Sequence, residues 1–184
     1  MYALLRLYAV TGRDELRRAA LEGVAHETAL FDPARGNWPD LRLRDGGAHA
    51  FGTSWCQGAP GIGLARLACA GLPGDAAIGR DVEPAVRTAL AAAADGCDQL
   101  CCGAMGRTEL LLSAAGRRNR PELERAARTI AGAVLDRAGR SGSFDFGVKG
   151  AVDNPGLFQG AAGIGYQLLR LAEPETLPAL LLWE

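Results

Sequence analysis

Two stretches of the sequence, Ser54–Gly63 (SWCQGAPGIG) and Leu100–Gly106 (LCCGAMG), place cysteine within the two residues before a Gly-x-x-Gly turn. Each turn is followed by a short apolar run of helical length. A third stretch, Phe158–Gly165 (FQGAAGIG), keeps the turn and the apolar run but has no cysteine. The repeated unit is therefore an element of the fold, and only two of its three copies carry cysteine. This separation of scaffold and thiols indicates a metal site.

The spacing of the three turns predicts a helical repeat. Gly58, Gly103 and Gly160 are separated by roughly fifty residues, which is typical of stacked helix pairs. Each unit consists of a glycine turn, a short apolar helix, a loop and a longer amphipathic helix. Since a helix that is apolar on most faces must be buried on most faces, we expect the short helices to form an inner layer and the amphipathic ones an outer layer. We therefore predict an all-α fold, a partial α/α toroid of inner and outer helix pairs.

Hydrophobic spacing gives the bounds of the predicted helices. We expect them over residues 1–8, 13–30, 60–70, 78–95, 103–115, 121–139 and 161–171. Residues 31–55 are rich in glycine and proline and show no convincing alternation of apolar and polar side chains. We expect this segment to be a long irregular loop, and loops of this length in compact domains are usually functional or mobile.

Composition and charge exclude several classes of protein. The chain has 184 residues, 48% of them apolar, which favours one folded domain over a disordered segment. Its net charge of −1 gives no electrostatic footprint for nucleic acid or for a membrane surface. No apolar run approaches the ~20 residues of a membrane span, and we find no signal-peptide pattern. We therefore expect a cytoplasmic protein with no nucleic-acid partner and no membrane span.

The five cysteines fit metal binding or burial better than a disulfide framework. An odd number cannot pair completely, and thiols stay reduced in the cytoplasm. Cys69 lies within a predicted apolar helix, so we expect an inert buried thiol there. Cys97 lies shortly before the second cysteine motif, but spacing alone is a weak signal, and we do not assign it to the metal.

Five stretches of the sequence resemble the LanC-like lanthionine cyclases. They span nearly the whole chain and are Asn37–Asp40 (NWPD), Ser54–Gly63, Leu100–Gly103 (LCCG), Phe158–Tyr166 and Leu181–Glu184 (LLWE). The chain looks most like the cyclase domain at the C-terminal end of class II (LanM-type) lanthipeptide synthetases. This resemblance implies an α/α toroid that holds one zinc ion at its central opening.

The resemblance also implies the metal ligands, the reaction and the substrate. Matched residue by residue, the family's zinc ligands are Cys56, Cys101 and Cys102 in this sequence. The family reaction adds a peptide cysteine thiol to dehydroalanine or dehydrobutyrine, which closes a lanthionine or methyllanthionine ring in lanthipeptide biosynthesis. The implied cofactor is Zn²⁺, and the implied partner is a dehydrated precursor peptide.

The chemistry of three cysteine ligands fits this reaction. Three protein ligands leave the fourth position of a tetrahedral zinc open, as in a catalytic site. Zinc binds a substrate thiol as the nucleophilic thiolate. Because three protein thiolates already outweigh the charge of the ion, a fourth thiolate should be held less tightly and stay reactive. Michael addition also needs an acid that protonates the enolate formed on the acceptor residue.

The sequence departs from the family at the residue expected to supply this acid. The family usually has a His-Gly motif one repeat before the first cysteine motif, followed by a helix that corresponds here to Tyr2–Leu7. The expected histidine would then lie upstream of Met1, so the catalytic residue is unknown. We therefore expect residues 1–184 to be the C-terminal portion of a LanC-like cyclase domain, with an exposed apolar edge that favours self-association.

The histidines present have no sequence context that suggests catalysis. His26 falls within a predicted amphipathic helix, and we interpret it as structural. We interpret His49, in the long loop, as an exposed bystander. Trp38 and Asp40 are expected to pin that loop rather than to contact substrate.

Two other functions remain open at this point. A LanC-like zinc-binding module without independent catalysis would carry the same cysteine motifs. A carbohydrate-active α/α toroid would need paired carboxylates at its centre, and the starts of the predicted inner helices carry none. Phosphate binding by the Gly-x-x-Gly turns is disfavoured, because they follow no predicted strand and lack a partner lysine.

Overall fold

The computed structural model describes residues 1–45, 48–72, 78–147 and 154–184, and it is dominated by helices. The α-helices are α1 (Tyr2–Thr11), α2 (Asp14–Leu30), α3 (Ala59–Ala68), α5 (Val82–Ala92), α6 (Ala104–Arg118), α7 (Pro121–Ser141) and α8 (Ala161–Ala172). Short 3-10 helices are η1 (Gly79–Asp81) and η2 (Leu180–Leu182). The prediction of an all-α fold is confirmed, with helix ends close to those expected.

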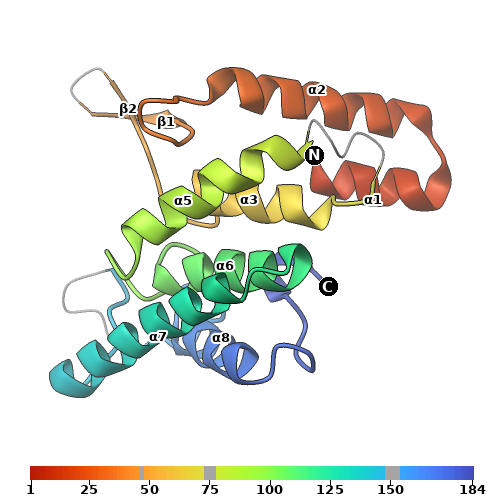
Figure 1. Ribbon diagram of the computed structural model, residues 1–184. Coiled ribbons are helices and arrows are strands. Elements are labelled where there is room, and N and C mark those ends of the chain that lie inside the picture. Colours follow the sequence, from red (N-terminus) through yellow and green to blue (C-terminus); the bar gives the residue numbers. More distant parts are fainter. Residues whose placement is uncertain (46–47, 73–77, 148–153) are drawn as a thin grey trace.

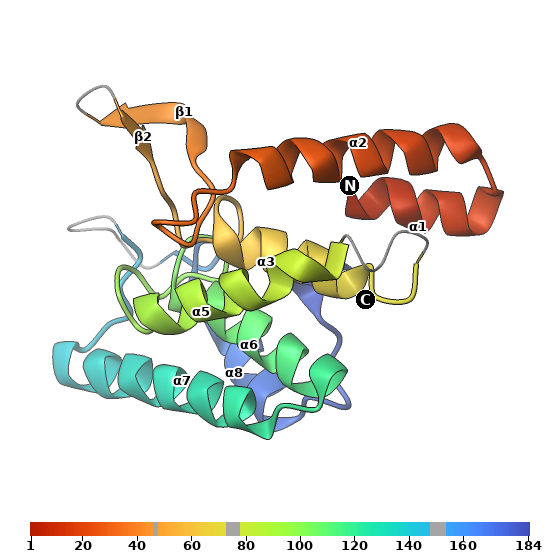
Figure 2. The same ribbon diagram turned by 45° about the horizontal axis from the view of Figure 1, so that its top comes forward.

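The helices pack as the repeat predicts. Each of α3, α6 and α8 follows a glycine turn, and α6 packs against both α3 and α8. The longer α5 packs on α3, and α7 packs on α6 (Figures 1 and 2). Helix α6 is buried on every face from Ala104 to Ala115, as expected of an inner helix. The inner and outer helices are thus present, whereas closure into a toroid stays a prediction.

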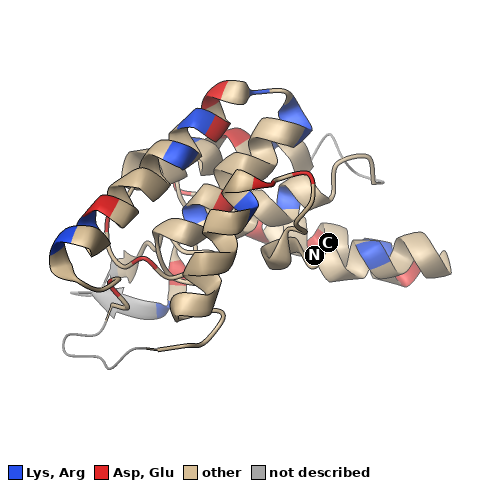
Figure 3. Ribbon diagram, turned by 90° about the horizontal axis from the view of Figure 1, so that it is seen from below, with Lys and Arg blue, Asp and Glu red and all other residues tan. Residues whose placement is uncertain are grey.

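Helix α7 shows why the outer helices have one apolar face. Leu123, Ala127, Ile130 and Val134 recur at helical spacing and are buried against the core. The opposite face is charged and includes the pair Arg128–Glu124, separated by 2.8 Å. Basic and acidic positions are interspersed over the described helices in Figure 3. None of these helices has the length and apolar character needed to cross a membrane.

Helices α1 and α2 form a hairpin that projects from the rest of the molecule (Figures 1 and 2). Gly12 ends α1 in the left-handed conformation, with φ of 68°, and its N–H donates to the Tyr8 carbonyl at 2.8 Å. A second, small hydrophobic cluster attaches the two helices to the rest of the chain: Leu5, Ala20 and Val24 pack with Cys69, at the end of α3, and Ile78, before η1. Leu7 and Val10 on α1 are exposed, whereas Leu5 is fully buried, and the expected self-association stays a prediction.

The segment 31–55 is less irregular than expected, because it contains a small antiparallel hairpin. Strand β1 (Asp40–Asp45) pairs with β2 (Ala48–Ala50), with a register irregularity between Asp40 and Arg44. The run Leu41-Arg42-Leu43-Arg44 in β1 does alternate between apolar and charged residues, a short period-two signal that we did not interpret as a strand. As expected, Trp38 pins the segment: its ring is buried, and its Nε1–H donates to the Glu27 carbonyl at 2.8 Å.

A close backbone contact explains the second glycine of each turn. A Cβ at Gly61, Gly106 or Gly163 would lie 1.9, 2.4 or 1.7 Å from a carbonyl oxygen. In each case the carbonyl belongs to the residue six positions earlier, which is Trp55, Leu100 or Leu157. Only glycine leaves room for this contact, so the three turns share one packing arrangement.

Substitution of this glycine should therefore destabilise the protein. We expect Gly106→Ala to lower the free energy of unfolding by about 1–3 kcal/mol, because the new methyl group overlaps the Leu100 carbonyl. Gly116→Ala on the same helix is the matched control: nothing lies within 4 Å of its Cβ, and it should raise stability by about 0.4–1 kcal/mol. Urea unfolding measures both, and equal effects of the two substitutions would refute the close-contact explanation.

Candidate metal centre

The three glycine turns are hydrogen-bonded to one another in chain order. The Trp55 N–H donates to the Cys101 carbonyl at 3.0 Å, and the Cys101 N–H donates to the Phe158 carbonyl at 2.8 Å. These backbone bonds hold the first turn against the second and the second against the third. Residues far apart in the sequence are thereby fixed side by side at the starts of α3, α6 and α8.

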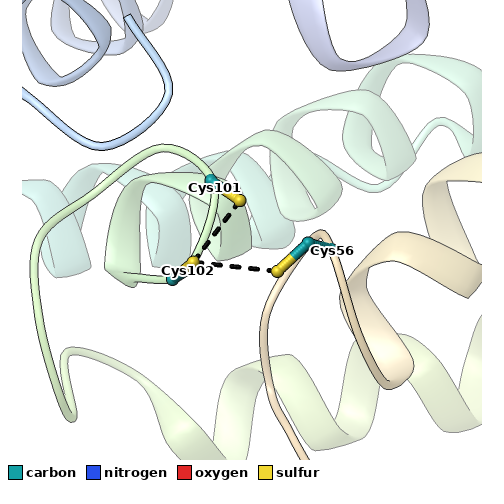
Figure 4. Close-up of side chains that lie close together, drawn as sticks. All are labelled: Cys56, Cys101 and Cys102. Atoms are coloured by element: carbon teal, nitrogen blue, oxygen red, sulfur yellow. Dashed lines mark hydrogen bonds between the residues drawn. The ribbon is translucent and has the colours of Figure 1, made fainter. Parts of the chain in front are cut away.

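This arrangement brings three thiols together. The Sγ atoms of Cys56 and Cys102 are 3.7 Å apart, and those of Cys101 and Cys102 are 3.4 Å apart. All three sulfur atoms lie within 4.8 Å of one another. In Figure 4 the side chains converge from two loops, Cys56 from one and the cysteine pair from the other. Among the described residues, this is the one group of His, Cys, Asp or Glu whose ligand atoms could together hold a metal ion.

Buried polar contacts fix the loops that carry the thiols. The Ser54 hydroxyl donates to the Cys102 carbonyl at 3.1 Å. The buried Arg107 guanidinium on α6 donates to the Ala93 carbonyl at 2.9 Å and to the Thr53 carbonyl at 3.2 Å. Arg107 thus ties the approaches to both cysteine turns together. The sequence analysis missed this residue, although an arginine within an otherwise apolar predicted helix was the available signal.

The protonation of the thiols depends on their surroundings. Cys56 is exposed, whereas Cys101 and Cys102 are half-buried. Burial raises the pKa of both Cys101 and Cys102, and the neighbouring Cys56 thiol raises it further. Three thiolates at these distances repel one another unless a cation lies between them. The donor set therefore fits a soft divalent metal ion, which favours the thiolate forms.

The helix N-termini add positive potential to the same place. Helix α3 has Gly58 as its N-cap and α6 has Gly103, so Cys56 and Cys102 lie within two residues of the N-caps. Free N–H groups at a helix N-terminus stabilise nearby negative charge. The N-termini of α3 and α6 thus lower the free-energy cost of bringing thiolates together at this site.

A comparison with protein families agrees with this geometry. The family model described as lanthionine synthetase C-like protein matches residues 1–182. The chain belongs to this family. A search of curated proteins found no match. Membership supports the resemblance seen in the sequence at the level of the LanC-like family, while the closer likeness to class II synthetases stays a prediction.

The two remaining cysteines of this LanC-like protein lie outside the three-thiol group. Cys69 is fully buried at the end of α3, as expected, and its Sγ lies 3.3 Å from the Met1 sulfur. Cys97 is half-buried before the second turn, and burial raises the pKa of its thiol. Its carbonyl has a structural role, since it accepts the Ala104 N–H at 2.9 Å.

The two histidines lie on other elements. His26 is exposed on α2. His49 is half-buried on β2 rather than exposed, so the expected exposure is wrong, while its role as a bystander stays a prediction. It lines a pocket together with Phe31 and Phe51. Asp40 acts within the loop as expected, since its carboxylate accepts two hydrogen bonds from the Arg42 guanidinium, both at 2.9 Å.

A row of aromatic rings begins beside the thiols, and the sequence analysis did not identify it. The rings of Trp55 and Phe158 are stacked at a centroid distance of 5.7 Å. The Phe158 ring also contacts Trp183 at 6.3 Å. The third turn, which has no cysteine, is thus packed by its phenylalanine against the tryptophan that precedes Cys56.

The metal-free protein should be sensitive to alkaline pH. Because folding raises the pKa of Cys101 and Cys102, their stabilising effect is present below the usual thiol pKa of about 8.5 and is lost as pH rises through the raised values. We expect the Tm in the presence of a chelator to fall above about pH 8.5, and to fall less in a Cys101→Ser/Cys102→Ser variant. Thermal melting from neutral to alkaline pH tests this, and parallel curves for the two proteins would disprove it.

Proposed function

We propose that this chain is a zinc-dependent lanthionine cyclase domain of the LanC-like family. It would add cysteine thiols of a dehydrated precursor peptide to dehydroalanine or dehydrobutyrine, closing lanthionine or methyllanthionine rings. One observation carries the proposal: Cys56, Cys101 and Cys102 place three sulfur atoms within 4.8 Å of one another in a member of this family.

The choice of zinc rests on the donor set. Soft thiolate ligands favour zinc among the common divalent ions, and a site with three protein ligands leaves a position for substrate. Cys56 and the Cys101–Cys102 pair would hold the ion. When bound, zinc stabilises a substrate thiol as the thiolate at neutral pH. The exposure of Cys56 supports access of a peptide from solvent.

The chain's own groups would set the charge and shape of the site. The three cysteines give up their protons on metal binding, and the N-termini of α3 and α6 stabilise the resulting charge. Trp55 lines a pocket together with Cys56, and its ring stacks on that of Phe158. The acid that protonates the enolate is not among these groups, and the family resemblance assigns it to a histidine.

A second candidate function is a zinc-binding LanC-like module that does not cyclise on its own. It is favoured by the places of the two histidines, one exposed on α2 and the other half-buried on β2. Neither belongs to the three-thiol group. Zinc binding is common to both candidates, so the rate of ring formation distinguishes them.

The purified protein should bind one zinc ion per chain through the three cysteines. We expect Cys102→Ala to weaken zinc binding by at least about 100-fold, because loss of a ligand costs no less than loss of an outer-shell partner. Cys69→Ala is the control, since Cys69 is buried away from the cluster. Elemental analysis and chelator competition measure stoichiometry and affinity. Full affinity in Cys102→Ala would show that the site is wrong.

Thioether formation should depend on the same cysteines. We expect the zinc-loaded chain to cyclise a dehydrated precursor slowly, because the absence of a placed general acid typically costs about 10²–10⁴ in rate. Alkylation of remaining thiols followed by mass spectrometry gives the rate. A rate above uncatalysed addition that disappears in Cys102→Ala supports the cyclase, and zinc binding with only the uncatalysed rate supports the module. Catalysis that survives in Cys102→Ala would exclude the proposed site.

A further inference from the structure

The first cysteine turn is closed differently from the other two. In the second turn, the Ala104 N–H donates at 2.9 Å to the Cys97 carbonyl seven residues earlier. In the third turn, the Ala161 N–H donates at 2.7 Å to the Asn154 carbonyl, again seven residues earlier. A direct backbone bond thus joins the first residue of the helix to the start of each of these turns.

In the first turn the side chain of Asn37 lies between the two backbone groups that bond directly in the other turns. The equivalent groups are the Ala59 N–H and the Gly52 carbonyl. The Ala59 N–H donates instead to Asn37 Oδ1 at 2.9 Å, and Asn37 Nδ2–H donates to the Gly52 carbonyl at 2.9 Å. The Asn37 amide therefore bridges the two ends of the turn. Gly58 has φ of +90°, whereas Gly103 and Gly160 have extended values of −126° and −139°.

Asn37 is itself held firmly in place. Its side chain is buried, with the residue 3% exposed. Its backbone exchanges two hydrogen bonds with Asp32, at 2.9 and 3.3 Å. The next residue is the buried Trp38, whose N–H donates to Asn37 Oδ1 at 2.8 Å. The bridge is thus attached to a rigid part of the segment 31–55 and not to a free loop.

Cys56 lies inside the bridged segment, between Gly52 and Ala59. Cys101 and Cys102 lie inside a segment that the backbone closes without help. The closure of the turn that carries Cys56 therefore depends on one side chain, whereas the equivalent closure around Cys101 and Cys102 is a direct backbone bond. Loss of the amide would leave the buried Ala59 N–H and Gly52 carbonyl unpaired, which favours a change in the path of this turn alone.

We propose that Asn37 is the positioning residue that sets Cys56 against the Cys101–Cys102 pair and so determines the affinity and thiolate number of the metal site. This inference rests on the proposed function for its metal. Asn37 acts through Cys56 and does not itself contact metal or substrate. Outer-shell residues of this kind typically change metal affinity by about 10–100-fold.

The test compares substitutions at Asn37 with a matched control in the third turn. Asn37→Ala removes both halves of the bridge, and Asn37→Asp keeps the acceptor but loses the donor to Gly52. The control is Asn154→Ala, because the Asn154 side chain also spans a glycine turn, accepting the Gly156 N–H at 2.9 Å and donating to the Gln159 carbonyl at 3.0 Å. That turn carries no cysteine.

Metal binding gives the first measurement. With Co²⁺ as the probe, we expect the sulfur-to-cobalt absorption of Asn37→Ala to fall by about a third, as one of the three thiolates leaves, and its zinc Kd to rise by about 10–100-fold. Asn37→Asp should show a smaller change in the same direction. If Asn37→Ala does not fold, the test is made with Asn37→Asp instead. Asn154→Ala should match the unsubstituted protein. Circular dichroism verifies that each variant keeps its helices.

A second measurement needs no metal. The Sγ atoms of Cys56 and Cys102 are 3.7 Å apart, so mild oxidation of the metal-free protein should link them. We expect this link to form several-fold more slowly in both Asn37 variants and normally in Asn154→Ala. Folded Asn37 variants with unchanged linking and unchanged metal binding would overturn the inference. If the unsubstituted protein binds no zinc, the proposed function fails, while the linking rates still decide the role of Asn37.

Discussion

The structure depends on the contact between glycine turns and the carbonyl groups that lie beneath them. At Gly61, Gly106 and Gly163 the helix backbone sits directly on a carbonyl oxygen, where any side chain would collide. The same tight turns then exchange backbone hydrogen bonds, from Trp55 to Cys101 and from Cys101 to Phe158. The position of the thiols is therefore a property of backbone packing. The cysteines could be placed together only because the scaffold first brought the turns together.

An alignment of the three turns on their first glycines shows that equivalent positions carry different side chains. Cys56, Cys101 and Phe158 occupy one position, and Gln57, Cys102 and Gln159 occupy the next. One repeat thus supplies a single thiol, the next supplies a pair, and the third supplies an aromatic ring that packs on Trp55. Equivalent backbone positions carry thiols in two turns and a packing contact in the third. Family membership over residues 1–182 is consistent with this shared scaffold.

Sequence reasoning predicted the parts that arise from periodicity and local chemistry. Helical spacing predicted α7, whose stripe from Leu123 to Val134 is buried as expected, and glycine context singled out the three grouped cysteines. It failed where long-range pairing decides the outcome. The hairpin of β1 and β2 carries only a four-residue alternation, Leu41 to Arg44, which was not interpreted as a strand, so the half-burial of His49 was missed. The roles of Arg107 and Asn37 were missed because each is defined by carbonyl groups distant in the sequence.

The sharing of thiols between two turns has a consequence for local unfolding. Repeat proteins can open one unit at a time, since each unit contacts mainly its neighbours. An ion held by Cys56 together with Cys101 and Cys102 would join the unit of α3 to that of α6, so that neither could open without releasing it. The unit of α8, whose turn has no thiol, would remain outside this cooperative block. The rates of amide hydrogen exchange would then differ on the two sides of the third glycine turn. The amides of α3 and α6, whose turns carry the cysteines, would exchange more slowly than those of α8.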